Sequence, residues 1–260
     1  MGMKIVQVAS SDGSLGRNVG CEKAPKEICK YLNGFCIDYV NVVKGNLDET
    51  GKNIERAEGD IFIGGDHSLT YFSFKGFAKR KKDPGLLILD AHLDCDYYTK
   101  SVTYEDFVRK LIDEKILKKE NVIWVGVRRI FKVEKEFSKG LNIFKINSIK
   151  RNLRSVCRKV INLCRGFSDV YLSIDIDVVD PVFAPGTGHR ERNGMTEKEI
   201  LFFLKKLKCL HNIEKIDLVE INPVDGSTNL RRSNLLPLKS FIPQTKSTGL
   251  KCVASCTMRF

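Results

Sequence analysis

The chain has 260 residues, 42% of them hydrophobic, which suits one large α/β domain with a sizeable core. Its apolar runs fall far short of the roughly 18 residues of a membrane span, its first residues show no signal-peptide pattern, and its nine scattered cysteines include no Cys-x-x-Cys pair that would indicate a zinc ribbon. The net charge of +12 is typical of nucleic-acid binding, but much of it lies in helix-like or turn segments that predict solvated faces.

Strands and helices alternate along most of the chain. Short runs rich in apolar and β-branched residues predict eight strands, at Lys4–Val8, Cys36–Val42, Asp60–Gly64, Leu86–Asp90, Asn121–Val127, Asn142–Ile146, Val170–Asp177 and Ile216–Asn222. Helical spacing of apolar residues predicts helices at Ala24–Leu32, Phe107–Leu117, Ile149–Leu163 and Thr196–Leu207, the last with a capping box at its start. This alternation indicates a mostly parallel sheet covered by helices on both faces, in one domain over residues 1–225.

The C-terminal segment, residues 226–260, differs in character from the rest of the chain. It contains six Lys or Arg residues and no acid, and it shows no sustained 3.6-residue period. We therefore expect an irregular basic tail. Because neither interleaved aromatic residues nor a recognised module accompanies this charge, we expect no nucleic-acid partner.

The most unusual stretch begins at Leu86, where an apolar run ends in Asp90-Ala91-His92-Leu93-Asp94. In an extended chain, alternate side chains share one face, so Asp90, His92 and Asp94 would point the same way. Three such side chains in register suit a metal site better than a hydrophobic core.

Three further predicted strands end in polar residues of the same kind. The third strand runs into Gly64-Gly65-Asp66-His67-Ser68, the seventh carries Asp175 and Asp177, and the eighth reaches Glu220. Unpaired carboxylates in such apolar surroundings are costly to bury, and sites in parallel sheets form where strands end at their carboxyl edge. The sequence therefore predicts one ligand-binding site at that edge.

Together these motifs resemble the ureohydrolase superfamily, the manganese-dependent arginase and agmatinase group. The resemblance covers roughly residues 1–225 and rests on the ordered motifs at 64–68, 90–94, 173–181, 184–188 and 220–223. It implies a three-layer α/β/α fold around an eight-stranded, mainly parallel sheet. It also implies a hydrolase of arginine or polyamine metabolism, for which the reduced cysteines indicate a cytoplasmic location; a homo-oligomer follows from the resemblance alone.

Carried onto this chain, the resemblance implies a site for two Mn²⁺ ions per subunit. One ion would be bound by His67 and Asp94, the other by His92 and Asp177, and both would be bridged by Asp90 and Asp175. Carboxylates and imidazoles without a thiolate also suit Mn²⁺ better than zinc.

The same resemblance implies the chemistry. A hydroxide that bridges the two ions would attack the guanidinium carbon of a small guanidino substrate and release urea and an amine. Asp94 would hydrogen-bond this nucleophile, and Glu220 would pair with the substrate guanidinium. We expect Asp66 and Asp180 to orient ligands or form turns, and Cys95 to face away from the site.

The sequence departs from the family where many members carry a histidine that passes a proton to the leaving amine. The corresponding loop, residues 99–107, contains none, and Thr103 or Tyr104 takes that position. Loss of a general acid can forfeit roughly 10²–10⁴ in rate. Our hypothesis is that His189 points into the cleft and supplies this catalytic acid; the alternative is a surface histidine.

The sequence leaves alternatives open for both the substrate and the activity. Lys100, Arg190 or Arg192 could bind the carboxylate of arginine, and agmatine, guanidinobutyrate and formimidoylglutamate also remain open. A one-zinc deacetylase of the related fold is disfavoured by the full set of six ligands. The other alternative is a regulatory or binding protein of the same fold that binds metal but is catalytically weakened.

Overall fold

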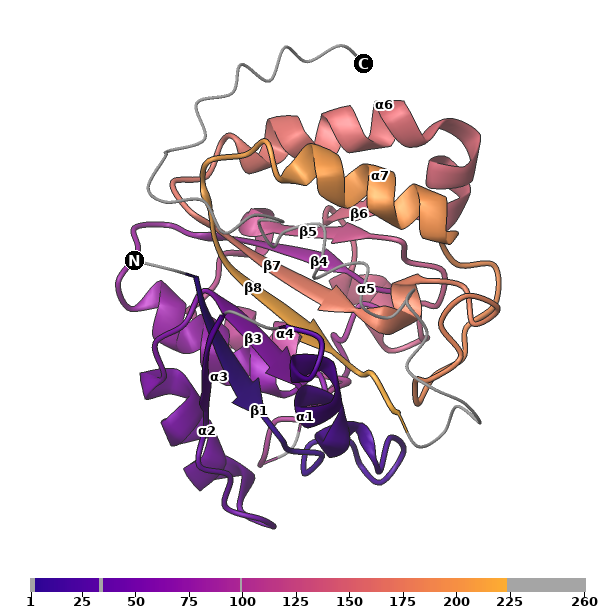
Figure 1. Cartoon of the computed structure of the whole chain (residues 1–260). Helices are drawn as coiled ribbons and strands as arrows, with labels where there is room; N and C mark the ends of the chain where they lie inside the picture. Colours follow the sequence, from indigo (N-terminus) through magenta and orange to yellow (C-terminus); the bar gives the residue numbers. More distant parts are fainter. Residues whose placement is uncertain (1–2, 33–34, 99, 224–260) are drawn as a thin grey trace, which may run out of the picture.

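The computed structural model describes residues 3–32, 35–98 and 100–223, and there eight strands form one sheet (Figure 1). The strands are β1 (Lys4–Val8), β2 (Cys36–Tyr39), β3 (Ile61–Gly64), β4 (Gly85–Leu89), β5 (Val122–Val125), β6 (Asn142–Phe144), β7 (Val170–Asp175) and β8 (Ile213–Val219). Their spatial order is β2-β1-β3-β8-β7-β4-β5-β6, and every neighbouring pair is parallel. The predicted eight-stranded sheet is confirmed.

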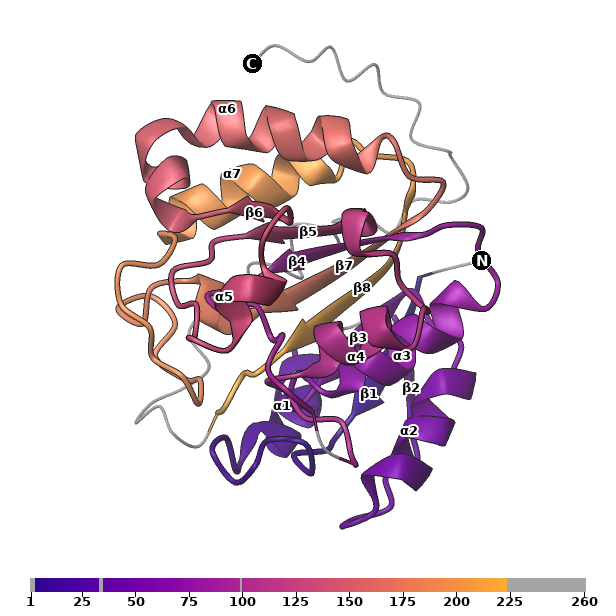
Figure 2. The ribbon, with the colours of Figure 1, turned by 180° about the vertical axis from the view of Figure 1, so that it is seen from behind.

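Helices cover both faces of this sheet and complete the three layers (Figures 1 and 2). One face packs against α1 (Ala24–Cys29), α6 (Ile146–Cys164) and α7 (Glu197–Leu207), and the other against α2 (Leu47–Arg56), α3 (Leu69–Ala78) and α4 (Phe107–Asp113). Strand β4 is buried on both sides, with Leu87 and Leu89 in one cluster and Leu86 and Ile88 in the other. The predicted three-layer α/β/α fold is therefore confirmed.

Two helices on the second face, α2 and α3, escaped prediction. In α3 eight of the ten residues are buried, so no polar face remains to set a 3.6-residue period. Helix α2 carries Gly51, where a Cβ atom would lie 2.1 Å from the Phe72 ring of α3. Glycine lowers helix propensity, but here it lets the two helices approach closely.

The remaining predicted helices are present, although their ends differ. Helix α7 begins as predicted: the Thr196 hydroxyl accepts a hydrogen bond from the Glu199 amide at 3.3 Å, and the Glu199 carboxylate accepts one from the Thr196 amide at 2.7 Å. A short helix, α5 (Glu134–Phe137), was not predicted.

Two properties bear on the wider organisation of the chain. The predicted tail, residues 226–260, lies outside the described residues. Within the described ranges, none of the helices combines the length and apolar character needed to span a bilayer.

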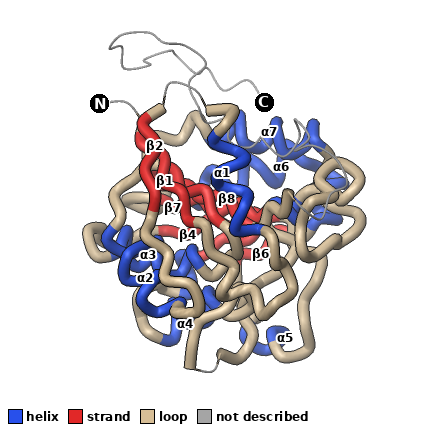
Figure 3. The backbone as a smooth tube through the Cα atoms, turned by 60° about the horizontal axis from the view of Figure 1, so that its bottom comes forward, coloured by secondary structure: helices blue, strands red, loops and turns tan. Residues whose placement is uncertain are grey.

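Long loops rather than helices dominate the edge of the sheet that faces the viewer in Figure 3.

Candidate metal centre

The four segments that carry the predicted ligands meet at one edge of the sheet. Strands β3, β8, β7 and β4 are consecutive neighbours at its centre, and all four run in the same direction. The segments that follow them therefore leave the sheet side by side. This arrangement brings together residues that lie far apart in the sequence, from His67 to Glu220.

The extended conformation predicted for the ligand segments was wrong, because most of the ligands follow the strands instead of alternating along them. Strand β4 ends at Leu89, and the next residues turn, with the Asp90 carboxylate accepting a hydrogen bond from the His92 amide at 2.7 Å. Strand β7 ends at Asp175, and Asp177 lies on a 3₁₀ helix where its amide donates to the Asp175 carboxylate at 2.7 Å.

Two residues in these turns have left-handed backbone conformations. The φ angle is +52° at Asp94 and +63° at Glu220, a region that costs energy for residues other than glycine. Glu220 directly follows β8, which ends at Val219, and Asp94 lies in the turn segment after β4, which ends at Leu89. This strain bends the chain so that the two acids turn back toward the ligand group.

The first group of ligands surrounds His67. Its Nδ1 atom lies 3.2 Å from an Asp90 oxygen, 3.1 Å from an Asp94 oxygen and 3.3 Å from an Asp175 oxygen. The ring is fully buried, and three carboxylates on one nitrogen exceed what a single N–H can satisfy.

The second group surrounds His92. Its Nδ1 atom lies 2.9 Å from an Asp177 oxygen and 3.5 Å from the second oxygen of Asp90. Asp90 thus faces both histidines, one with each carboxylate oxygen. Burial lowers the pKa of His92, but the carboxylates of Asp177 and Asp90 outweigh it and raise the pKa to about 12.

The two groups together contain four carboxylates and only two imidazoles. Burial raises the pKa of the Asp94 and Asp175 carboxyl groups well above the usual value, and neighbouring carboxylates raise it further. For His67, burial lowers the pKa, but the carboxylates of Asp175, Asp90 and Asp94 raise it well above its usual value. A bound cation would relieve this repulsion.

The donor set fits divalent metal ions. His67 Nδ1 and one Asp90 oxygen are buried without a hydrogen-bond partner among the described residues. Two sets of three ligand atoms lie close enough together to hold an ion, one from His67, Asp90 and Asp175 and the other from Asp90, His92 and Asp177. Carboxylate oxygens with imidazole nitrogens suit Mn²⁺, because hard oxygen ligands dominate.

Behind His67 lies a polar network that was not predicted. The Nε2 atom of His67 lies 2.8 Å from the Ser173 hydroxyl, which donates to Asp217 at 2.7 Å. Asp217 is fully buried and also accepts hydrogen bonds from Thr70 and Tyr171, each at 2.7 Å. A bonded Nε2 fixes the ring so that Nδ1 faces the carboxylates. The one signal of this network in the sequence is Asp217, an acid inside a predicted apolar strand.

Glu220 lies next to the ligand group, beside His67, and its side chain is buried. Its carboxylate accepts a hydrogen bond from the His67 amide at 2.6 Å and one from the Asn18 side chain at 2.6 Å. Burial, together with the charge of Asp66, raises the pKa of Glu220 to about 8. Glu220 does not line the cavity described next.

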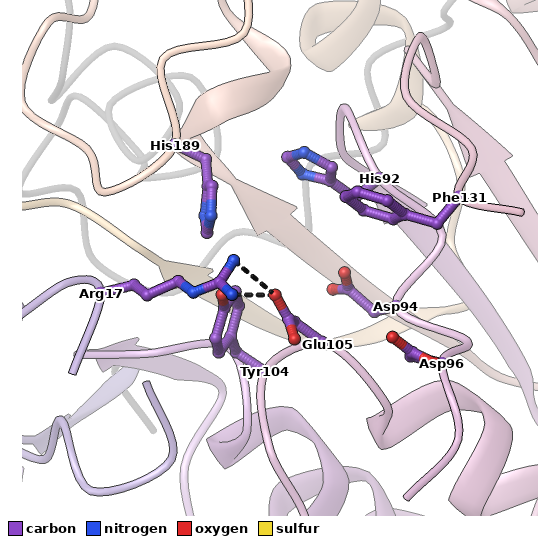
Figure 4. A pocket seen from close by; sticks show the side chains of 8 residues that line it. All are labelled: Arg17, His92, Asp94, Asp96, Tyr104, Glu105, Phe131 and His189. Atoms are coloured by element: carbon purple, nitrogen blue, oxygen red, sulfur yellow. Dashed lines mark hydrogen bonds and ion pairs between the residues drawn. The ribbon is translucent and has the colours of Figure 1, made fainter. Parts of the chain in front are cut away.

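A cavity of about 160 Å³ opens beside the ligands (Figure 4). Its lining residues come from several loops and are Arg17, His92, Asp94, Asp96, Tyr104, Glu105, Phe131 and His189. In Figure 4, Asp94 and Asp96 lie on one side, with Arg17, Tyr104 and Glu105 across from them. A small molecule in this cavity would contact two of the proposed metal ligands.

Two questions that the sequence left open concern residues at this cavity. Tyr104 lines it, whereas Thr103 turns away and its hydroxyl donates to Asp106 at 2.6 Å. His189 lies within the site, with its ring stacked on Tyr104 at 5.4 Å and edge-on to His92 at 5.4 Å. Burial lowers the pKa of His189.

Comparison with known proteins agrees with this geometry. A sequence model described as the Arginase family matches residues 35–236. The chain belongs to the arginase family. It is 31% identical over 199 residues to an arginase of Staphylococcus aureus, a match that covers 70% of this chain and 66% of the relative. It is 35% identical over 167 residues to an agmatinase of Bacillus cereus, covering 62% of this chain and 55% of the relative.

A solved structure of the same family has the same fold. The crystal structure of an arginase from Bacillus subtilis matches with a TM-score of 0.83 at 20% identity, covering 95% of this chain and 99% of that one. In the sequence matches, this chain spans just under two thirds of the staphylococcal arginase and about half of the Bacillus cereus agmatinase.

Within this arginase fold, the cations proposed for a substrate carboxylate lie elsewhere. Arg190 and Arg192 line a separate surface hollow beside Asp180 and Pro185. Lys100 is exposed and does not line the cavity. Arg17, which the sequence gave no reason to select, is the lining residue with a permanent positive charge.

The acids expected to form turns do so. Asp66 accepts hydrogen bonds from the Gly13 and Ser68 amides at 3.0 and 2.9 Å, and Asp180 accepts from the Val182 amide at 3.0 Å. The Cys95 thiol donates to the Leu93 carbonyl and packs in the core, so it faces away from the ligands.

Proposed function

We propose that the protein hydrolyses a guanidino C–N bond of a small substrate with two Mn²⁺ ions and releases urea and an amine. The observation that carries this proposal is the convergence of buried imidazoles and carboxylates beside a cavity of substrate size. Membership of the arginase family supports it, as do the arginase and agmatinase relatives. A cytoplasmic enzyme of arginine or polyamine metabolism is supported by buried cysteines that form no disulfide among the described residues, which are Cys21, Cys95, Cys157 and Cys164.

Six residues would hold the ions. We assign one ion to His67 and Asp94 and the other to His92 and Asp177, with Asp90 and Asp175 bridging. Two such ions, when bound, lower the pKa of a water molecule toward neutrality and polarise the substrate.

The protein's own side chains then orient the reaction. We propose that Asp94, which lies both beside His67 and in the cavity wall, accepts a hydrogen bond from the attacking water. We also propose that Glu220 pairs with the guanidinium. Two of its acceptor sites serve His67 and Asn18, and a carboxylate offers about four. The water oxygen adds to the guanidino carbon to give a tetrahedral intermediate, and the bond from this carbon to the alkyl nitrogen then breaks, so that urea forms and the nitrogen leaves as an amine after taking up a proton.

His189 is the proposed donor of the proton that the leaving nitrogen takes up. Its place in the cavity, between Tyr104 and His92, supports this assignment. We expect His189→Ala to lower kcat by about 10²-fold and to change its pH profile, as loss of a general acid does. Unchanged turnover with an unchanged pH profile would show that His189 is not the donor.

The experiment for the whole proposal is urea release from a panel of guanidino compounds, with and without added Mn²⁺. We expect Mn²⁺-dependent urea from wild type, and neither urea nor bound metal in Asp90→Asn. The matched control, Asp38→Asn, removes a carboxylate that is exposed on β2 and far from the ligands, and it should behave as wild type. Two bound ions without urea from any compound would instead favour a catalytically weakened metal-binding protein.

A further inference from the structure

The charged groups of the cavity leave one acid without a counterion. Apart from the proposed metal ligands, the charged lining residues are Arg17, Asp96 and Glu105. The Arg17 guanidinium lies 3.2 Å from a Glu105 oxygen, and the Tyr104 hydroxyl donates to that same oxygen at 2.7 Å. The positive charge of Arg17 is therefore already matched by Glu105.

Asp96 lies across the cavity from this pair. Its side chain is half-buried, and it accepts a hydrogen bond from the amide of its neighbour, Tyr97, at 2.6 Å. Among the residues that the structure describes, no Lys or Arg forms an ion pair with it. A half-buried carboxylate without a counterion favours a ligand that brings a positive charge.

Other cations at this side of the molecule do not line the cavity. Arg129 lies 5.3 Å from the centre of the Phe131 ring but does not line the cavity. Arg190 and Arg192 belong to the separate surface hollow. The Phe131 ring itself, 40% exposed, adds a surface that attracts cations and offers nothing to a carboxylate.

We infer that the cavity selects a guanidino substrate whose far end is an amine rather than a carboxylate, and that Asp96 makes this choice. The inference rests on the proposed function, because it treats the end of the substrate that does not react. Asp96 lines the same cavity as the proposed ligands His92 and Asp94, so a substrate that extends from the metal centre into this cavity passes its carboxylate. One carboxylate without a counterion near the end of the substrate is enough to change kcat/KM by about tenfold or more between an amine and a carboxylate.

The test compares three compounds that share a guanidinium and a four-carbon chain. They end in an amine (agmatine), a methyl group (butylguanidine) or a carboxylate (4-guanidinobutyrate). We expect kcat/KM to fall in that order, with agmatine at least about tenfold above 4-guanidinobutyrate. Equal values, or a higher value for the carboxylate compound, would overturn the inference while leaving the proposed hydrolysis in place.

Variants at Asp96 show whether this residue is responsible. Asp96→Asn should reduce the ratio of agmatine to 4-guanidinobutyrate by about tenfold, and Asp96→Lys should invert it. The matched control is Asp113→Asn, which removes the same charge from α4 outside the cavity and should keep the wild-type ratio. An unchanged ratio in Asp96→Asn would contradict the assignment to Asp96.

A binding measurement separates this inference from the proposed reaction. Calorimetry with the Mn²⁺-loaded protein compares 1,4-diaminobutane with 4-aminobutyrate, neither of which contains a guanidino group. We expect the diamine to bind at least about tenfold more tightly in wild type, and Asp96→Asn to remove the difference. If no guanidino compound is hydrolysed but this preference appears, the proposed function fails and the inference stands; without the preference, the inference fails.

Discussion

Asp90 presents its two carboxylate oxygens to different histidines. One oxygen lies 3.2 Å from His67 Nδ1 and the other 3.5 Å from His92 Nδ1. A residue shared in this way makes the two ligand groups interdependent, because removing it takes a ligand from both. This is why the Asp90→Asn variant described above should lose both ions rather than one.

Lys215 is a buried cationic side chain on β8, away from the proposed ligands. Its side chain is 7% exposed, with Nζ 4.4 Å from the centre of the Phe62 ring. Burial, with a smaller contribution from Arg80, lowers the pKa of Lys215 from 10.5 to about 8. The folded protein therefore binds this proton less tightly than the unfolded chain does.

We predict that Lys215→Met stabilises the protein at pH 7. Below pH 8 both states carry the proton and the full cost of burying it is present, whereas the cost disappears as the pH rises through 8 to 10.5. The gain at pH 7 should be up to about 3 kcal/mol and should shrink by pH 10. Urea denaturation at both pH values measures it, with the exposed Lys52→Met as control. A gain that does not change with pH would contradict this explanation.

For single residues, the sequence predicted the candidate metal ligands but not the side chains that line the cavity beside them. The spacing of Asp90, His92 and Asp94 is local and can be read directly. The pairing of Arg17 with Glu105 joins loops 88 residues apart, and neither residue belongs to a periodic pattern. Such contacts arise only when the strands are ordered in the sheet.

At the scale of the elements, Arg128 joins the start and the later part of the long connection between β7 and α7. Its guanidinium donates hydrogen bonds to five backbone carbonyl oxygens, those of Gly126, Asp177, Val178, Glu191 and Arg192. The start of this connection carries the proposed ligand Asp177, and its later part carries His189 beside His92. Arg128 therefore fixes a proposed ligand relative to the proposed proton donor.

We predict that Arg128→Met weakens Mn²⁺ binding by about 10-fold to 100-fold, as loss of groups that orient ligands does. It should also lower kcat more than it raises KM, because this connection rather than the substrate contacts is loosened. Calorimetric Mn²⁺ titration and steady-state kinetics measure the two effects. The adjacent Arg129→Met is the control, since Arg129 is exposed and contacts the Phe131 ring. Wild-type Mn²⁺ affinity in Arg128→Met would rule out this role.

The elements also show where sequence patterns stop being informative. Strands β4 and β7 were predictable because each is a short apolar run, whereas α3 has no exposed face to mark it. The turns after β4 and β7 were expected to be extended. Left-handed Asp94 and the 3₁₀ helix at Ile176–Val178 depend on contacts with the neighbouring strands, which local sequence does not encode.

In the molecule as a whole, the site depends on the order of strands in the sheet. The sequence predicted eight parallel strands but gave no spatial order, and that order places β3, β8, β7 and β4 side by side. Residues from 67 to 220 must therefore fold together before either ligand group exists. The chain has the arginase fold over this range, and the cavity beside the ligands is lined by Tyr104, Asp96 and His189 among others.

The central claim is that water attacks the guanidino carbon and that urea leaves. Hydrolysis of agmatine by the Mn²⁺-loaded protein in ¹⁸O-labelled water tests it most directly, with mass spectrometry of both products. We predict one labelled oxygen in each urea molecule and none in the diamine. Release of ammonia, with the label in a ureido product that keeps its alkyl chain, would show that the other C–N bond breaks and would contradict the account.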